Sequence, residues 1–384
     1  MKIVIAPDSF KECLSAEGVA KAIANGWRKA DPSADITLLP VADGGEGTAD
    51  TLLSVTNGQR FNQLVTGPLA SPVNAFWGVL GSAAKQVQGN TAIIEMAAAS
   101  GLDLLPPKQR NPLATTTWGT GELILAALDH GVERIIIGLG GSATNDGGAG
   151  MLQALGVLML DGEGRRIPLG GGGLSQLESI DISGLDPRLK DVRFEVACDV
   201  DNPLVGPDGA SAVFGPQKGA TPEQVKVLDA NLQHFAKLTL AVTGNDVANV
   251  AGAGAAGGLG GAFWGYLNAT LRRGIDIVLD AVSFEQHLEA VDLVITGEGR
   301  MDRQSAYGKT PVGVARRTKA FGNIPVIALA GELSEGAEDV YEHGIDAVFS
   351  IAQGVSNLES ALAQAESHLS HTTENIARVV HALS

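Results

Sequence analysis

Short apolar runs alternate with amphipathic stretches along the whole chain of 384 residues. Buried strands are predicted where an apolar run meets a polar or glycine-rich loop, at residues 3–6, 36–41, 92–96, 134–139, 194–197, 291–296, 324–329 and 346–351. Helices are predicted where apolar residues recur three and four positions apart, at residues 19–27, 123–128, 225–235 and 358–369. Ser15 is the expected N-cap of the first helix. This alternation is typical of α/β proteins with largely parallel sheets.

The chain is longer than a single hydrophobic core usually supports, so two domains are expected. The two ends of the chain resemble each other as compact strand–loop–helix units, whereas the middle carries long glycine-rich loops. We predict a discontinuous, Rossmann-like α/β domain built from residues 1–72 and 288–384. An inserted α/β domain is predicted over residues 73–287.

The net charge of the chain limits the kinds of molecule that it is expected to bind. The formal net charge is −16, which argues against binding to nucleic acid or to an anionic membrane surface. No run approaches the roughly 20 apolar residues of a membrane helix, and the N-terminus is a strand signal rather than a signal peptide. Two cysteines, Cys13 and Cys198, fit a reducing compartment, so a cytoplasmic location is expected. A phosphate enzyme of this charge needs local groups that offset the negative background.

A loop rich in glycine and hydroxyl residues follows the strand predicted at 134–139. Backbone N–H groups in such a loop bind phosphate without a basic residue. The competing interpretation is a tight strand-to-helix turn that has no ligand. If the loop is functional, its candidate phosphate ligands are Gly140, Gly141, Ser142, Thr144, Asp146 and Gly147.

Two other nucleotide motifs match the sequence only in part. Gly138-x-Gly140-x-x-Ala143, with Asp161 after a second apolar run, partly fits a dinucleotide fingerprint and keeps an NAD-dependent oxidoreductase as an alternative. Gly308-Lys309-Thr310 resembles the end of a P-loop, but Arg303 stands where that motif needs its first glycine. Lys309 is either a point charge for a phosphate or a solvated lysine before a proline-started helix.

Three acidic segments follow predicted strands, at residues 43–48, 199–202 and 297–302. One such segment alone is more often a surface turn or helix cap, but three at strand ends favour a ligand site. Mg²⁺ needs only one or two carboxylates besides phosphates and water. No zinc-hydrolase spacing and no Gly-x-Ser-x-Gly elbow occurs.

Ten segments, in order along the chain, resemble the glycerate kinase family of the bacterial type 1 class. They are APDSFK (6–11), ADGGEGT (42–48), IEMAAASGL (94–102), RNPL (110–113), GTGE (119–122), GGSATxDGG (140–148, in which Asn145 departs from the family pattern), ACDVDNPL (197–204), FGPQKGA (214–220), GAAGG (254–258) and VITGEGR (294–300). The resemblance covers essentially the whole chain. It implies two α/β domains, one discontinuous and one inserted, with the active site in the cleft between them. It also implies ATP, Mg²⁺ and D-glycerate, and usually 2-phosphoglycerate as the product, in the breakdown of sugar acids.

Residue roles follow as hypotheses from this resemblance and from the chemistry of phosphoryl transfer. The 140–148 loop and Lys309 are expected at the ATP phosphates, and Asp199 with Asp201 at Mg²⁺. Asp43 is expected to accept or orient the hydroxyl proton, while Lys11 and Arg300 pair with the glycerate carboxylate or the transferring phosphoryl. The expected substrate-binding residues are Asp8, Ser9, Glu46 and Arg110. Transfer to the 3-hydroxyl, a non-catalytic binding protein and a homo-oligomeric state stay open.

Overall fold

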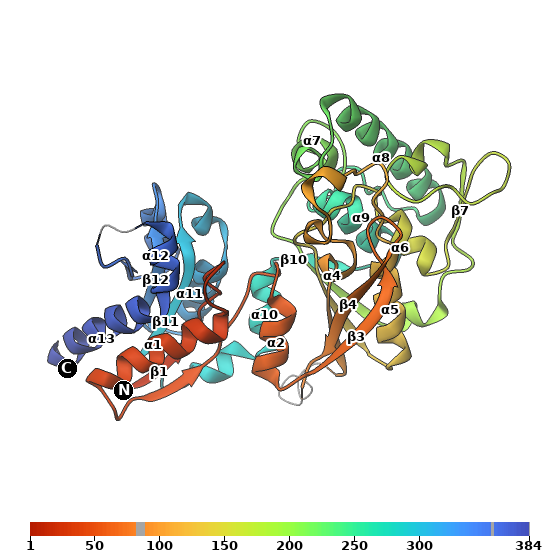
Figure 1. Ribbon diagram of the computed structural model, residues 1–384. Helices are drawn as coiled ribbons and strands as arrows, with labels where there is room; N and C mark the ends of the chain where they lie inside the picture. Colours follow the sequence, from red (N-terminus) through yellow and green to blue (C-terminus); the bar gives the residue numbers. More distant parts are fainter. Residues whose placement is uncertain (82–88, 355–356, 384) are drawn as a thin grey trace. The chain divides into compact units, whose positions relative to one another are not determined.

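The computed structural model describes residues 1–81, 89–354 and 357–383, which form two compact units (Figure 1). The first unit comprises Met1–Asp43, Asp50–Val55 and Ile275–Ser384, and the second comprises Gly44–Ala49 and Thr56–Gly274. The boundaries expected at 72/73 and 287/288 therefore move. The first lies earlier because β3 (Gln59–Thr66) pairs with β4 (Pro72–Val79) in the sheet of the second unit. The second lies earlier because most of helix α10 (Gly274–Ala281) belongs to the first unit.

The first unit is built on a five-stranded, wholly parallel sheet in the order β13-β12-β11-β1-β2. Its strands, all anticipated from apolar runs, are β1 (Lys2–Ile5), β2 (Asp35–Leu38), β11 (Leu293–Met301), β12 (Val326–Leu333) and β13 (Ala347–Ser350). The chain leaves β1 for β2 on one side of the sheet and returns to β11 on the other. The strand order thus reverses between β1 and β11, and in open parallel sheets ligands bind outside the carboxyl ends of the strands at such a switch point.

Helices α1 (Ala16–Ala30) and α13 (Ala365–Leu383) lie side by side in this unit (Figure 1). Ser15 caps α1 as predicted, because its hydroxyl accepts the Gly18 N–H. The apolar face of α1 packs with strand and helix residues such as Ile5, Ile295 and Leu369. The helix predicted over 358–369 is two helices, α12 (Leu358–Ala363) and α13, which meet at Gln364. The unit also contains α11 (Thr310–Phe321) and the 3-10 helices η6 (Phe284–His287), η7 (Arg303–Tyr307) and η8 (Ala337–His343).

The second unit contains a six-stranded sheet in the order β10-β9-β6-β5-β4-β3. Strands β5 (Thr91–Glu95), β6 (Arg134–Gly138), β9 (Arg193–Ala197) and β10 (Thr270–Arg272) run parallel, whereas β4 and β3 are antiparallel. Strands β7 (Leu158–Leu160) and β8 (Ser179–Asp181) form a separate two-stranded antiparallel sheet. The helices are α4 (Ala97–Ser100), α5 (Trp118–Asp129), α6 (Ala149–Ala154), α7 (Ala210–Phe214), α8 (Pro222–Thr243) and α9 (Ala255–Leu267), with shorter 3-10 turns between them. Helix α2 (Thr48–Thr56) has residues in both units.

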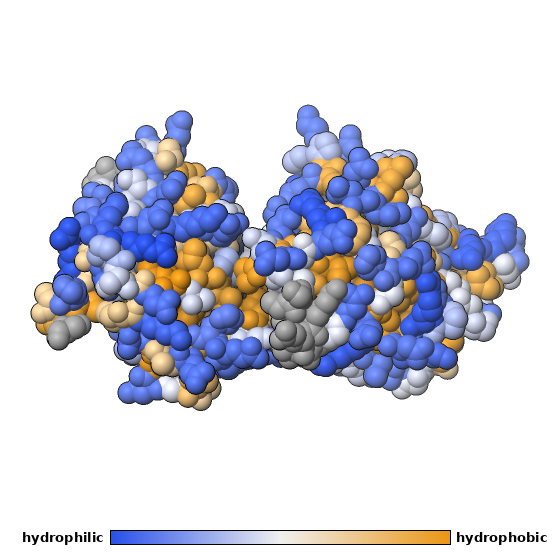
Figure 2. Space-filling model, turned by 90° about the horizontal axis from the view of Figure 1, so that it is seen from below, coloured by the Kyte–Doolittle hydropathy of each residue, from blue (hydrophilic) through white to orange (hydrophobic). Residues whose placement is uncertain are grey.

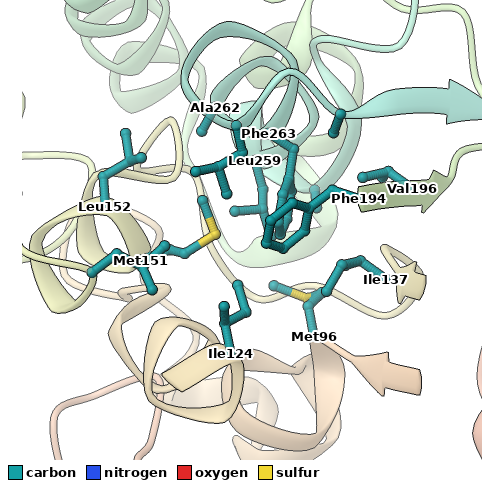
Figure 3. Packing of buried hydrophobic residues seen from close by; sticks show 14 of the residues in the cluster. Met96, Ile124, Ile137, Met151, Leu152, Phe194, Val196, Leu259, Ala262 and Phe263 are labelled. Carbon is teal, nitrogen blue, oxygen red and sulfur yellow. The ribbon is translucent and has the colours of Figure 1, made fainter. Parts of the chain in front are cut away.

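The core of the second unit fixes the carboxyl ends of its parallel strands. Phe194 and Val196 of β9 face Leu259 and Phe263 of α9, and apolar residues of β6, α5 and α6 close the cluster (Figure 3). Burial of this apolar area is the main favourable term that holds the loops after β5, β6 and β9 in place.

The surface seen in Figure 2 is mostly hydrophilic on each unit, with separate hydrophobic patches between the hydrophilic residues. Among the helices of the described residues, none is both long and apolar enough to cross a membrane.

Candidate functional site

Carboxylates gather at the switch point of the first unit. Beyond β1 the chain stays paired with β11, because the Ala6 N–H donates to Ile295 O and the Asp8 N–H donates to Gly297 O, both at 2.8 Å. This extended pairing brings the Asp8 side chain to Glu298 on β11, and the charge of Asp43 acts on both carboxyls. Two of the expected residues, Asp8 and Asp43, are thus together. Glu298 was seen in the sequence only as part of an acidic segment.

The electrostatics of this cluster favour proton transfer near neutral pH. Burial raises the pKa of Asp8 to about 6, with a further push from Asp43, while hydrogen bonds from Thr310 and Ser9 oppose it. Burial raises the pKa of Glu298 to about 7, and the Ser305 hydroxyl and the charge of Lys309 oppose it. Perturbed carboxyls near neutrality, placed at a ligand edge, are suited to general acid–base work.

Helix α11 delivers a cation and a hydroxyl to the same cluster. Lys309 is the N-cap residue, and its Nζ lies 3.8 Å from Asp302 Oδ1. Thr310, the first helical residue, donates from Oγ1 to Asp8 Oδ2 at 2.6 Å. Gly308 has φ of 108°, a left-handed conformation that directs the chain into the helix. Lys309 therefore lies beside carboxylates rather than in a P-loop.

The other expected residues of the first unit differ in how firmly their side chains are held. The Ser9 N–H donates to Asp8 Oδ1 at 2.6 Å, so Ser9 orients Asp8 directly. Lys11 is exposed in the turn closed by the Phe10–Leu14 bridge. Arg300 is exposed and its Nε lies 3.7 Å from Asp302 and 3.8 Å from Glu332.

The glycine-rich loop of the second unit is fixed by backbone hydrogen bonds to residues 100–102, and its two first glycines are exposed. The Leu102 N–H donates to Gly141 O at 2.8 Å and the Ala143 N–H donates to Ser100 O at 2.9 Å. Gly140 and Gly141 are exposed, and Gly141 has φ of +71°. Within the described part of the chain, the amides of Gly140, Gly141 and Ser142 donate to no protein acceptor. Successive amides of this kind form an anion-binding concavity.

Three of the expected phosphate ligands are enclosed within the second unit. Asp146 is wholly buried, and its carboxylate accepts from Thr117 and from the amides of Gly148 and Gly150. Thr144 is also wholly buried. Gly147 has φ of +63°, and a Cβ there would lie 2.9 Å from a Phe235 ring carbon. In this fold Asp146, Thr144 and Gly147 are enclosed by protein and shape the loop, and their contact with phosphate stays a prediction.

A lysine that sequence reasoning missed lies beneath this loop. Lys218, at the end of η5 (Pro216–Lys218), is 1% exposed. Its Nζ donates to Ser142 Oγ at 2.8 Å and to Thr144 O at 2.7 Å. The neighbouring residues Pro216, Gln217 and Gly219 are typical of a surface turn, so the sequence does not predict that Lys218 is buried.

Arg110 belongs to the same unit and is half-buried. Its Nε is buried and has no hydrogen-bond partner within the described residues. Its carbonyl oxygen lies 2.5 Å from where a Cβ of Gly219 would stand, which explains the glycine after Lys218. An orphaned guanidinium nitrogen of this kind is suited to an anionic group. Glu46, in contrast, is exposed in the short segment 44–49.

Asp199 and Asp201 follow β9 and are exposed. The Gly274 N–H donates to Asp199 Oδ1 at 2.9 Å, which orients that carboxylate. Among the described residues, no group of three or more His, Cys, Asp or Glu side chains could hold a metal ion. The donor set fits Mg²⁺ of the kind that completes its octahedron with phosphates and water, not an all-protein cage.

The dinucleotide fingerprint fails in the fold. Helix α6 begins at Ala149 rather than at Gly140, and β7 lies with β8 in a separate two-stranded sheet, outside the parallel sheet. Asp161 binds its own turn, because it accepts from the Glu163 and Arg165 amides.

Comparison with known proteins gives one consistent result. A family model described as the glycerate kinase family matches residues 3–381. The chain belongs to the glycerate kinase family. It is 58% identical to a glycerate kinase of Bacillus subtilis (strain 168), over 98% of this chain and 97% of the relative. It is 53% identical to the glycerate 2-kinase of Escherichia coli (strain K12), with the same coverages of 98% and 97%.

A solved structure agrees with these relatives. A crystal structure named "putative glycerate kinase 2" from Salmonella typhimurium LT2 superposes with a TM-score of 0.90 at 55% identity, covering 100% of this chain and 98% of that chain. As a member of the glycerate kinase family, the chain is an ATP-dependent kinase. Within that family assignment, the unpaired amides of residues 140–142 and the carboxylates at the β1–β11 switch point are candidate groups for the chemistry.

Proposed function

We propose that this member of the glycerate kinase family transfers the γ-phosphoryl group of ATP to the 2-hydroxyl of D-glycerate, giving 2-phosphoglycerate and ADP. The observation that carries the chemistry is the meeting of Asp8, Asp43 and Glu298 beside Lys309. Phosphoryl transfer needs a group that takes the hydroxyl proton and charges that stabilise the transferring group, and this cluster offers both.

The nucleotide phosphates are assigned to the amides of Gly140, Gly141 and Ser142. Backbone donors suit a protein of net charge −16, because they attract phosphate without depending on surface lysines or arginines. Asp199 and Asp201 are assigned to Mg²⁺, which neutralises phosphate charge when bound. The exposure of both aspartates and the fixed orientation of Asp199 support this assignment.

The glycerate is assigned to the side chains around the switch point. Asp43 accepts or orients the hydroxyl proton, with Asp8 and Ser9 as its neighbours in the cluster. Lys11 and Arg300 pair with the glycerate carboxylate or the transferring phosphoryl; the exposure of both cations supports this role. Glu46 and Arg110 keep their expected substrate-binding role, and the orphaned Arg110 Nε supports an anionic partner for that residue.

Transfer to the 2-hydroxyl rests on the name of the Escherichia coli relative, which is a glycerate 2-kinase. Transfer to the 3-hydroxyl is the competing outcome. The deciding experiment supplies ATP, Mg²⁺ and D-glycerate and couples the product to enolase, with and without phosphoglycerate mutase. Enolase accepts only the 2-phosphate, so a signal without mutase supports the proposal. A signal that requires mutase means 3-hydroxyl transfer, and silence from folded protein in both assays refutes the substrate.

A further inference from the structure

The ammonium group of Lys218 is enclosed directly behind the loop that presents free amides. Lys218 is 1% exposed, and both of its hydrogen-bond acceptors, Ser142 Oγ and Thr144 O, belong to that loop. An enclosed ammonium is costly to desolvate, and neutral oxygens compensate this cost less than a carboxylate would. A lysine kept there against that cost calls for a function.

We propose that Lys218 is a positioning residue for the nucleotide phosphates, which acts through Ser142 and becomes positively charged behind the amides of Gly140 to Ser142 when a phosphate binds there. The inference rests on the proposed function, because it takes those amides as the phosphate site.

The hydrogen-bond geometry gives Lys218 a specific effect on Ser142. The hydroxyl oxygen of Ser142 accepts from the ammonium, so the hydroxyl hydrogen must point elsewhere. The Ser142 hydroxyl is therefore available to donate a hydrogen bond, as the amides of Gly140 and Gly141 are. The second bond, to Thr144 O, holds the inner half of the loop, so that the outer half keeps a fixed shape.

The charge on Lys218 is sensitive to an incoming anion. Burial lowers the pKa of Lys218 to about 7, and Asp146 is the charged group that opposes this shift. The Asp146 carboxylate is already satisfied by Thr117, Gly148 and Gly150, and it therefore neutralises the lysine only in part. Above neutral pH the free enzyme largely lacks this positive charge. A bound phosphate favours the charged form, so binding near pH 8 takes up a proton.

The test is calorimetry of ADP binding with excess Mg²⁺ at pH 8, in buffers of different ionisation enthalpy. We expect the wild-type protein to take up a substantial fraction of one proton per ADP. Lys218→Met is expected to take up none and to bind ADP roughly tenfold to a hundredfold more weakly. Lys226→Met, which removes an exposed lysine from α8, is the matched control and is expected to behave as wild type. A residue with only a structural role would not change the proton uptake.

The outcomes separate this inference from the function on which it rests. If wild-type protein binds no ADP, the proposed function fails and the inference fails with it. If wild type and Lys218→Met bind ADP with equal affinity and equal proton uptake, only the role of Lys218 is refuted. Should Lys218→Met fail to fold, Ser142→Ala decides. Weaker ADP binding by this variant, together with proton uptake by wild type, supports the role, and wild-type affinity refutes it.

Discussion

Thr310 Oγ1 donates a 2.6 Å hydrogen bond to Asp8 Oδ2 across a sequence separation of 302 residues. This bond joins the segment that follows β1 to the start of α11, which are separated in the sequence by the second unit. The carboxylate cluster of the first unit is thus assembled by the two ends of the chain, and its protonation depends on contacts that no local sequence window contains.

Thr310→Val removes that hydrogen bond and keeps the shape of the side chain. Because the bond lowers the pKa of Asp8, we expect that pKa to rise above its value of about 6 in the wild type. Loss of the bond should also lower the free energy of unfolding at pH 8 by about 1–2 kcal/mol. NMR titration of the Asp8 carboxyl carbon and urea denaturation measure the two effects. Ser9→Ala, which removes a longer contact of 3.3 Å, should cause a smaller rise. An unchanged Asp8 pKa in Thr310→Val would contradict this view of the cluster.

Asp43→Asn is expected to lower kcat roughly 10²–10⁴-fold, because an amide cannot accept the hydroxyl proton. Steady-state kinetics with saturating ATP and D-glycerate measure the loss. Asp35→Asn, at an exposed position in the same unit, serves as the control for the change in net charge. A tenfold or smaller loss in a folded Asp43 variant would move the proton acceptor to Asp8 or Glu298.

Glu298→Gln should stabilise the protein at pH 8 while it lowers activity. The folded-state pKa of about 7 lies above the ordinary value of 4.5, so the folded protein holds a proton that the unfolded chain releases. Stability therefore falls as pH rises from about 4.5 to 7, and the destabilisation is complete above that window.

Removal of the buried charge is expected to raise the free energy of unfolding by about 1–2 kcal/mol at pH 8 and to change it little at pH 4. Urea denaturation of both proteins at the two pH values measures this. A Gln variant that is less stable than wild type at pH 8 would show that the charged form is stabilised in the fold.

Asp146→Asn is expected to cost about 3 kcal/mol or more of stability. The carboxylate accepts from several N–H and O–H donors, and an amide NH₂ would face donors instead of accepting from them. Thermal denaturation gives the size of the loss. Asp103→Asn, on the surface of the same unit, should change stability by less than about 0.5 kcal/mol. If the variant keeps near-wild-type stability but binds ATP poorly, Asp146 is a phosphate ligand as the sequence predicted.

Asp199→Asn should raise the Mg²⁺ concentration for half-maximal activity, roughly tenfold, because one anionic ligand is lost. The hydrogen bond from the Gly274 amide can persist to the remaining carbonyl oxygen, so stability should change little. Activity titrated against Mg²⁺ gives the value, and Asp208→Asn, at an exposed position in the same unit, is the matched control. Unchanged metal dependence would place the metal on other carboxylates.

The local sequence pattern predicts much of the fold. The apolar runs predicted every strand of the parallel sheet in the first unit, and Ser15 predicted the start of α1, because burial periodicity and capping act over a few neighbouring residues. The ten motifs likewise indicated the glycerate kinase family, which the comparisons confirm.

Tertiary structure decided what local pattern could not. Pairing of β3 with β4 moved the domain boundary, and packing divided one glycine-rich loop into exposed Gly140 and Gly141 and enclosed Thr144 and Asp146. The same packing enclosed Lys218, whose sequence neighbours are those of a surface turn. Whether a polar side chain meets water, a ligand or a buried partner depends on residues far along the chain, so only the folded arrangement determines its chemistry.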